Sequence, residues 1–317
     1  MSEHQLIQAL DARVSRREQR RDFFKAIGAA AVATGGLAVA ARTTSVQAQT
    51  ATTEADVLNF ALNLEYLEAQ FYSYATTSAG LPQELLSGQE PQGTVTAGRQ
   101  VSFSDPAVAA YAREITADER AHVAFLRNAL GVAAVSQPSL DLGVGPNNAF
   151  SRAARAAGLI GEGQTFDPYA NDENFLLGAF IFEDVGVTAY KGASILIRNK
   201  DFLEAAAGIL AVEAYHASIL RTTLFAKGIE TPSARLVEAT EAISGARDSL
   251  DGTMDLDQGI APTNGVSNIA PLDGDGIAFS RSPSQVLNIV YLNNAAVTSG
   301  GFFPSGVNGR VRTSGAN

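Results

Sequence analysis

Two glutamate–histidine pairs with the same spacing stand out in the sequence. Glu119 and His122 form one E-x-x-H motif, and Glu213 and His216 form another. Residues three apart on an α-helix share a face, so each motif places a carboxylate beside an imidazole. Apart from His4, these are the only histidines of the chain. Carboxylate–imidazole pairs of this kind suit transition-metal ions.

A single E-x-x-H motif is weak evidence for a metal site, because a core histidine or a solvated helix face gives the same pattern. An internal repeat strengthens the metal interpretation. Glu65 lies seven residues before Tyr72, and Glu183 lies seven residues before Tyr190. The segments that begin with the two motifs also align with each other. The chain therefore resembles two copies of one half-site, each with a single glutamate and one E-x-x-H pair.

All four glutamates interrupt the apolar faces of helical segments, which points them into the core. Buried ionised carboxylates are costly unless they are paired or bound to a metal. Two divalent cations would balance four carboxylates, and two neutral imidazoles would complete the ligand set. Iron and manganese suit this mixture, and zinc suits it less specifically. We therefore predict two transition-metal ions, iron or manganese, bound by Glu65, Glu119, His122, Glu183, Glu213 and His216.

Nearby polar residues leave several alternatives open. Glu68 lies one turn after Glu65, so it can replace that ligand or add to it, although its repeat counterpart Gly186 favours Glu65. Asp118 either orients an imidazole, as ligating histidines usually require, or lies in solvent. Asp184 is expected outside the ligand set.

Tyr72 and Tyr190 hold equivalent positions in the repeat. They are either core aromatics or hydrogen-bonding or redox-active neighbours of the metal ions.

Four segments with helical periodicity position these residues. Asp105 followed by Pro106 predicts the start of the second helix, and Asp201 with Glu204 predicts a capping box at the start of the fourth. We expect the four helices at 54–77, from 106, from 172 and from 201.

Connection lengths predict how the helices are joined. About 27 residues rich in Gly, Ser and Pro follow the first helix, and only a few residues around Asn199 join the last two, which are expected to be antiparallel neighbours. About 40 residues, Gly131 to Asn171, separate the second helix from the third. So long a connection needs an explanation, and a crossover along the bundle supplies one. The predicted fold is an all-α four-helix bundle with a long crossover between helices two and three.

The bundle is expected over residues 54–227, followed by a C-terminal extension over 228–317. Within the extension we predict a helix at about 232–250, loops, a short helix at about 284–292 and an irregular Gly/Phe/Pro tail. Phe302 and Phe303 of this tail are expected to dock on the bundle.

The ligand pattern, one glutamate from each of two helices and an E-x-x-H pair from each of two others, resembles the ferritin-like superfamily of dinuclear carboxylate proteins. The resemblance covers residues 54–227. The segment 279–291 and the Gly-Gly-Phe-Phe-Pro tail are most similar to the desiccation-related ferritin-like branch. This resemblance implies a ferritin-like bundle with the same six ligands, but it implies no particular reaction.

Residues 1–48 have the features of a signal peptide. Arg20-Arg21-Asp22-Phe23-Phe24-Lys25 resembles a twin-arginine export signal, an apolar run over 26–41 follows, and Val46-Gln47-Ala48 fits a cleavage site. The apolar run is too short and too mild for a lasting membrane anchor. We therefore expect a periplasmic or secreted protein, exported by the twin-arginine route.

Charge limits the possible partners. Removing residues 1–48 takes away seven of the 23 basic and four of the 33 acidic side chains, which changes the net charge from −10 to −13. Such a chain is repelled by nucleic acid and by anionic membranes. Metal ions with O₂ or peroxide are the expected partners, and homo-oligomer formation stays open. Cysteine is absent, so disulfides and zinc-thiolate sites are excluded.

The expected function is redox chemistry of the ferroxidase or manganese-catalase kind in stress protection. The alternative is a non-enzymatic metal-binding protein with a structural or desiccation-protective role. A ferritin storage cage fits less well, because of the C-terminal extension and the export signal.

Overall fold

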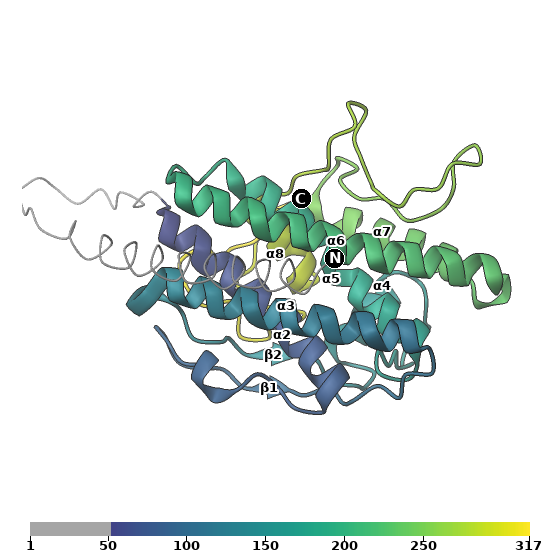
Figure 1. Cartoon of the computed structure of the whole chain (residues 1–317), viewed down its shortest axis with the longest axis horizontal. Coiled ribbons are helices and arrows are strands. Elements are labelled where there is room, and N and C mark those ends of the chain that lie inside the picture. The colour runs from purple at the N-terminus through teal and green to yellow at the C-terminus, as the bar shows by residue number, and fades with distance from the viewer. Residues whose placement is uncertain (1–51) are drawn as a thin grey trace, which may run out of the picture.

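The structure is a computed structural model that describes residues 52–317 (Figure 1). The predicted signal peptide lies outside the described residues. Helices dominate the described part, whose only strands are β1 (Val95–Thr96) and β2 (Leu140–Asp141), and this confirms the all-α class. The four long helices are α2 (Glu54–Thr77), α3 (Pro106–Leu130), α5 (Asp172–Ser194) and α6 (Lys200–Glu230).

Helix starts follow from side-chain caps. Asp105 caps α3 as expected, because its carboxylate accepts a hydrogen bond from the backbone amide of Ala107. The predicted cap of α6 is wrong. Asn199 caps this helix by accepting from the amides of Asp201 (2.8 Å) and Phe202 (3.4 Å). Asn and Asp cap helices about equally well, so the sequence pattern did not separate the two.

The long connection between α3 and α5 crosses the length of the bundle. Asn59 near the start of α2 donates a hydrogen bond to the carbonyl of Ala133, so α3 ends beside the start of α2. At the opposite end, Asp172 at the start of α5 accepts from the amide of Ser104. The crossover carries β2, which pairs in parallel with β1, and the short helix α4 (Ala149–Ala156), which the sequence analysis did not predict.

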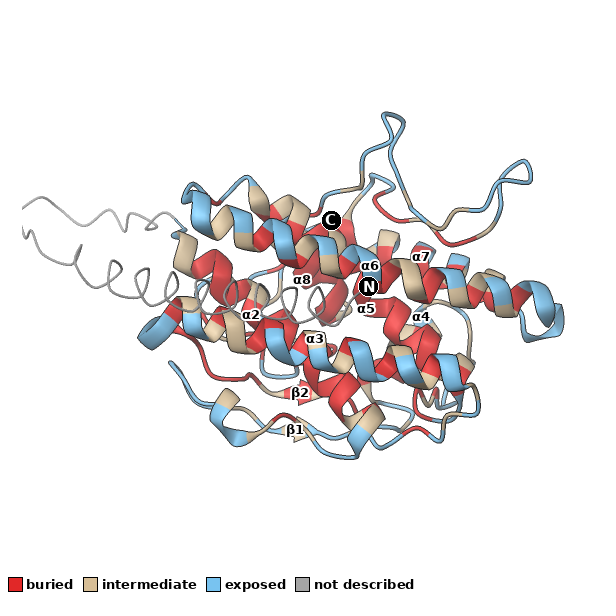
Figure 2. Cartoon of the chain, in the orientation of Figure 1, coloured by how far each residue is buried: buried red, intermediate tan, exposed pale blue. Residues whose placement is uncertain are grey.

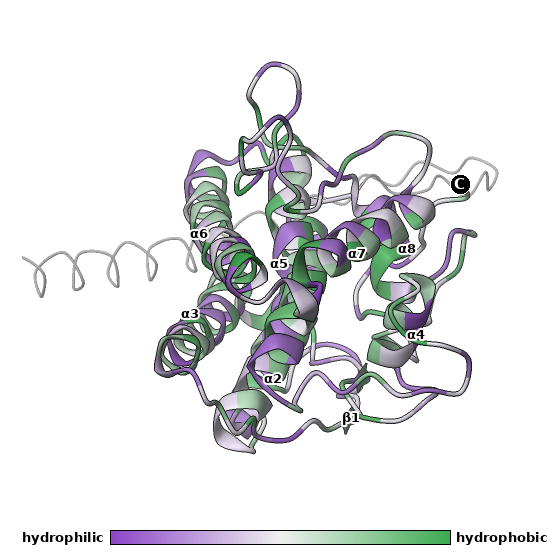
Figure 3. Cartoon of the chain, turned by 90° about the vertical axis from the view of Figure 1, so that its right-hand side faces the viewer, coloured by the Kyte–Doolittle hydropathy of each residue, from purple (hydrophilic) through white to green (hydrophobic). Residues whose placement is uncertain are grey.

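The C-terminal extension forms α7 (Leu236–Asp251) and α8 (Pro283–Tyr291). Viewed along the bundle, α4, α7 and α8 lie on the side of α2 and α5, while α3 and α6 form the opposite side (Figure 3). Buried residues concentrate between these layers (Figure 2). The tail docks as expected, since Phe302 is fully buried and its ring centroid lies 5.1 Å from that of Phe150 and 4.9 Å from that of Phe182.

Among the helices of residues 52–317, α6 alone is long and apolar enough to cross a membrane by length and composition. It carries Glu213, His216 and Arg221, all of which are buried inside the protein. One face of α6 thus carries buried ionisable groups and packs along α5, and 33% of its apolar window is buried.

Replacing Phe302 by alanine should destabilise the whole domain, because it opens a cavity where tail, crossover and bundle meet. We expect a loss of about 3–5 kcal/mol in the free energy of unfolding, measured by urea denaturation. The control Val132→Ala removes a side chain that is 88% exposed and should leave the unfolding midpoint nearly unchanged. Equal midpoints for the two variants would show that the tail contributes nothing to the core.

Candidate metal centre

The six predicted ligands converge in the middle of the bundle, and all of them are buried. They form two groups, within each of which the ligand atoms lie within 4.8 Å of one another. The first group consists of Glu65, Glu119, His122 and Glu213. The second group consists of Glu119, Glu183 and His216.

Glu119 belongs to both groups. Its Oε2 lies 3.7 Å from Nδ1 of His122, and its Oε1 lies 3.1 Å from Nδ1 of His216. A carboxylate that directs one oxygen to each of two neighbouring positions is suited to bridge two cations. Glu119 is therefore shared by the two groups, an arrangement compatible with a metal site.

The other three glutamates each face one imidazole. Around Nδ1 of His122, Oε2 of Glu65 lies at 3.2 Å and Oε1 of Glu213 at 3.6 Å. Oε2 of Glu183 lies 3.5 Å from Nδ1 of His216. Both imidazoles thus present the same nitrogen, Nδ1, to the carboxylates.

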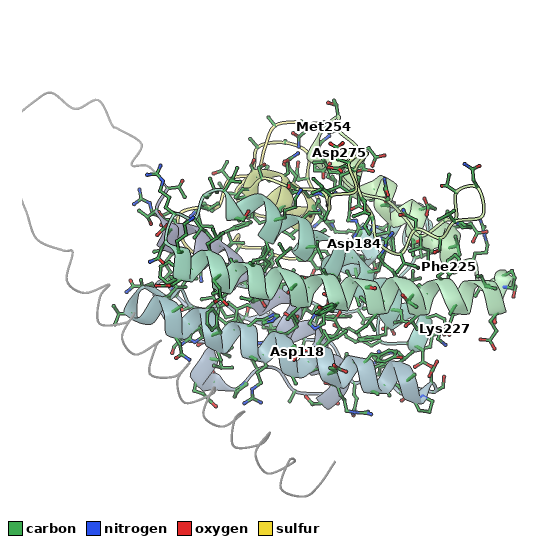
Figure 4. All side chains as sticks on the ribbon, turned by 45° about the horizontal axis from the view of Figure 1, so that its top comes forward. Asp118, Asp184, Phe225, Lys227, Met254 and Asp275 are labelled. Atoms are coloured by element: carbon green, nitrogen blue, oxygen red, sulfur yellow. The ribbon has the colours of Figure 1, made fainter. Side chains whose placement is uncertain are left out.

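Asp118 both contacts an imidazole and lies partly in solvent, the two alternatives that its sequence position left open. Its Oδ2 lies 3.2 Å from Nε2 of His216, although the Asp118 side chain is 43% exposed. A carboxylate on the outer nitrogen favours a proton there and leaves Nδ1 free to bind a metal. The repeat places Val212 at the equivalent position on α6, so the two halves differ in this contact. Figure 4 labels Asp118 on α3, beside the ribbon of α6.

Tyr72 and Tyr190 are buried hydrogen-bond donors to the single glutamates. The hydroxyl of Tyr72 donates to Oε1 of Glu183, and the hydroxyl of Tyr190 donates to Oε1 of Glu65. Each tyrosine thereby crosses from its own helix to the glutamate of the other half. The pair fixes one oxygen of each carboxylate and leaves the second oxygen for the site.

Glu68 is buried next to the two groups but belongs to neither of them. Burial raises its pKa well above the usual value, and the nearby carboxylates of Glu119 and Glu183 raise it further. Both effects favour the protonated form of this side chain.

Burial also raises the pKa of three carboxyl groups in the ligand set. The pKa of Glu65 rises to about 7, although the charge of His122 opposes the shift. Glu183 and Glu213 are raised as well; the imidazole of His216 partly offsets the shift at Glu183, whereas neighbouring carboxylates add to it at Glu213. Without a cation, this interior favours protonated carboxyl groups.

Glu119 and the two histidines form a charged centre in the metal-free protein. Burial would raise the pKa of Glu119, but the two nearby imidazoles, those of His122 and His216, lower it to about 2. Burial would lower the pKa of both imidazoles, but the adjacent carboxylates raise that of His122 to about 10 and that of His216 to about 11. The two protonated imidazoles supply the positive charge that bound metal cations would otherwise supply.

The donor set fits metal ions because it leaves buried polar atoms without hydrogen-bond partners. Six such atoms belong to the two groups: Oε1 and Oε2 of Glu119, Oε2 of Glu183, Oε1 and Oε2 of Glu213, and Nδ1 of His216. Buried carboxylate oxygens without partners are unfavourable unless a cation binds them. The buried cluster is therefore compatible with a metal site.

Gly186 provides the space for Glu213. A methyl group built on Gly186 would lie 2.3 Å from Oε2 of Glu213, far inside van der Waals contact. The sequence analysis noted Gly186 only as the repeat counterpart of Glu68. Its role depends on the distance between α5 and α6, which the pattern of residues does not contain.

The sequence analysis also missed an ion network around Asp184, which does lie outside the ligand set as expected. Asp184 accepts hydrogen bonds from Arg221 (2.8 Å) and Arg247 (3.2 Å). Asp257 accepts from Arg247 (2.6 Å) and Arg281 (3.1 Å). These residues connect the C-terminal extension to α5 and α6 directly behind the candidate metal centre. Their spacing along the chain gave no signal, because the partners come from distant segments.

The metal-free protein should lose stability as the pH rises. Glu65, His122 and His216 have raised pKa values, so the folded state binds more protons than the unfolded state at neutral and alkaline pH. Metal binding requires the deprotonated ligands, so the loaded protein should respond in the opposite direction. The difference in melting temperature between loaded and chelator-treated protein should therefore widen from about pH 6 to about pH 9. A difference that stays constant across this range would contradict proton–metal competition at these ligands.

Gly186→Ala should displace Glu213 and weaken metal binding by about 10- to 100-fold, measured by titration calorimetry and by metal content per chain. Gly208→Ala on α6 is a matched control, because nothing lies within 4 Å of its added methyl group. It should bind metal normally and gain about 0.5–1 kcal/mol of stability. Unchanged affinity in Gly186→Ala would refute the spatial role of this glycine.

The family model described as "Ferritin-like domain" matches residues 53–226. "Desiccation-related protein PCC13-62" of Craterostigma plantagineum is 30% identical over 247 residues, covering 74% of this chain and 76% of that protein. "Ferritin-like catalase Nec2" of Nesocodon mauritianus is 27% identical over 270 residues, covering 81% and 84%. No solved structure matches the chain significantly. The chain belongs to the ferritin-like family.

Proposed function

We propose that the protein is a dinuclear iron or manganese enzyme that disproportionates hydrogen peroxide. The observation that carries this proposal is the placement of Glu119 between two imidazoles, with one oxygen toward each. A relative named "ferritin-like catalase" supports the choice of peroxide. Two redox-active metal ions side by side supply two-electron chemistry, which converts two H₂O₂ into two H₂O and one O₂.

The protein's own residues hold the site in place for this reaction. Tyr72 and Tyr190 fix the single glutamates by hydrogen bonds from the opposite half. Asp118 holds His216 in the form that presents Nδ1 inward. The glutamates are buried, so bulk water does not reach their carboxylates. The absence of bulk water strengthens the electrostatic interaction of the carboxylates with any bound cation.

Metal-loaded protein should release O₂ from peroxide, measured with an oxygen electrode alongside metal content. Glu119→Gln removes the central charge and should lower metal content and O₂ release by at least about 100-fold. Glu114→Gln on the exposed face of the same helix is the matched control and should retain both. Full loading with both metals but no O₂ release, and no oxidation of Fe²⁺, would refute the enzymatic proposal.

A second candidate function is desiccation protection without turnover. It is favoured by the relative named as desiccation-related and by buried carboxylates that need cations. In this case the loaded protein melts at a higher temperature than the metal-free form and yet leaves peroxide unchanged. Metal-dependent melting is expected in both cases, so the oxygen-electrode measurement on fully loaded protein separates the two functions.

Export by the twin-arginine route remains part of our proposal, with the periplasm or the exterior as the destination. Its support is the Arg20-Arg21 signal and the apolar run that follows it. Twin-arginine transport carries folded proteins, so the buried site can be loaded with metal before export.

A further inference from the structure

A pocket with a volume of about 190 Å³ lies between the α5–α6 pair and the loop segment 256–281. On the helical side it is lined by Val187, Ala214 and Ala217, and on the loop side by Ile269, Leu272 and Phe279, among others. Apolar atoms form nearly all of its exposed wall. We propose that this pocket binds a small uncharged apolar molecule, about the size of one substituted aromatic ring.

The charged residues at the base of the pocket are paired with one another and with the backbone. Arg221 is fully buried and donates to Asp184 and to four backbone carbonyls, those of Gln258, Gly259, Asn268 and Ile269. Arg281 is likewise fully buried and donates to Asp251, Thr188 and Asp257. A charged ligand would lose its hydration in a wall that is nearly all apolar and whose charged residues already have partners, so the pocket selects against charge.

The size of the pocket sets the size of the ligand. Apolar cavities of about 150 Å³ hold benzene, so a pocket of about 190 Å³ holds one ring with a small substituent. Well-packed interiors leave few voids of this size. Here the space arises because four alanines line the pocket: Ala214, Ala217, Ala270 and Ala278.

The two walls differ in secondary structure. Helices α5 and α6 and the arginine–aspartate network form the base. Between α7 and α8, the described chain contains no regular helix or strand, so the cover is a loop (Figure 1). Leu272 and Ile277 on this loop are 41% and 51% exposed, which extends the apolar surface outward from the pocket. A preformed base under a loop is the usual construction of a small-molecule site.

The pocket is separate from the candidate metal centre. Asp184, which lines it, and Asp118, which contacts His216, lie on opposite sides of the α6 ribbon in Figure 4. Ala217 directly follows the candidate ligand His216, but no residue of the two ligand groups lines the pocket. The proposal thus extends beyond peroxide chemistry and does not depend on it.

Toluene is a suitable test ligand, with benzoate and benzylamine as charged analogues of similar size. Nuclear magnetic resonance titration of the full-length metal-loaded protein should show saturable binding of one toluene per chain. Both charged analogues should bind at least tenfold more weakly. No saturable toluene binding, or equal binding of benzoate, would overturn the proposal.

Two filling variants locate the site. Ala214→Phe on the helical wall and Ala278→Phe on the loop wall should each weaken toluene binding at least tenfold. Ala211→Phe, on the exposed face of α6 outside the pocket, should bind toluene normally. Toluene binding that survives both filling variants would place it elsewhere and refute the assignment. O₂ release measured on the same samples distinguishes this failure from a failure of the proposed enzyme.

Discussion

The structure depends on one electrostatic constraint, the need of several buried carboxylates for positive charge. Glu119 satisfies part of this need in the metal-free protein by pairing with His122 and His216, which lowers its pKa to about 2. Among the described residues, Glu213 has only His122 within ion-pair distance, at 3.6 Å, and burial together with the neighbouring carboxylates raises its pKa well above the usual value. Metal ions would replace the protons on the imidazoles and the carboxyl groups together. Loading and protonation are therefore two alternative ways to neutralise the same interior.

The internal repeat explains how the helices reach this arrangement, and its imperfections explain where the two halves differ. Each tyrosine reaches the glutamate of the other half, so the two halves hold one another in register. Where the first half has Glu68, the second has Gly186, whose missing side chain admits Glu213. The two groups of candidate ligands consequently differ: one contains four side chains and the other three.

The C-terminal extension attaches to the bundle through charge as well as apolar packing. Consecutive residues on α5 serve the two systems, since Glu183 faces the candidate metal centre and Asp184 faces Arg221 and Arg247. A helix turns by about 100° per residue, so neighbouring side chains can serve opposite sides of one wall. The extension thus closes the bundle on its α5 side and, with its loop, covers the apolar pocket.

The sequence by itself determined the four helices, the crossover and the six residues that converge, because helical periodicity fixes which side chains share a face. It also determined the docking of Phe302, which has few other places to bury its ring. Tertiary structure alone decided that Glu119 lies between both histidines, that Gly186 makes room for Glu213, and that Arg221 pairs with Asp184. These outcomes depend on distances between helices. Periodicity along one helix carries no information about those distances, so only the packed structure could reveal them.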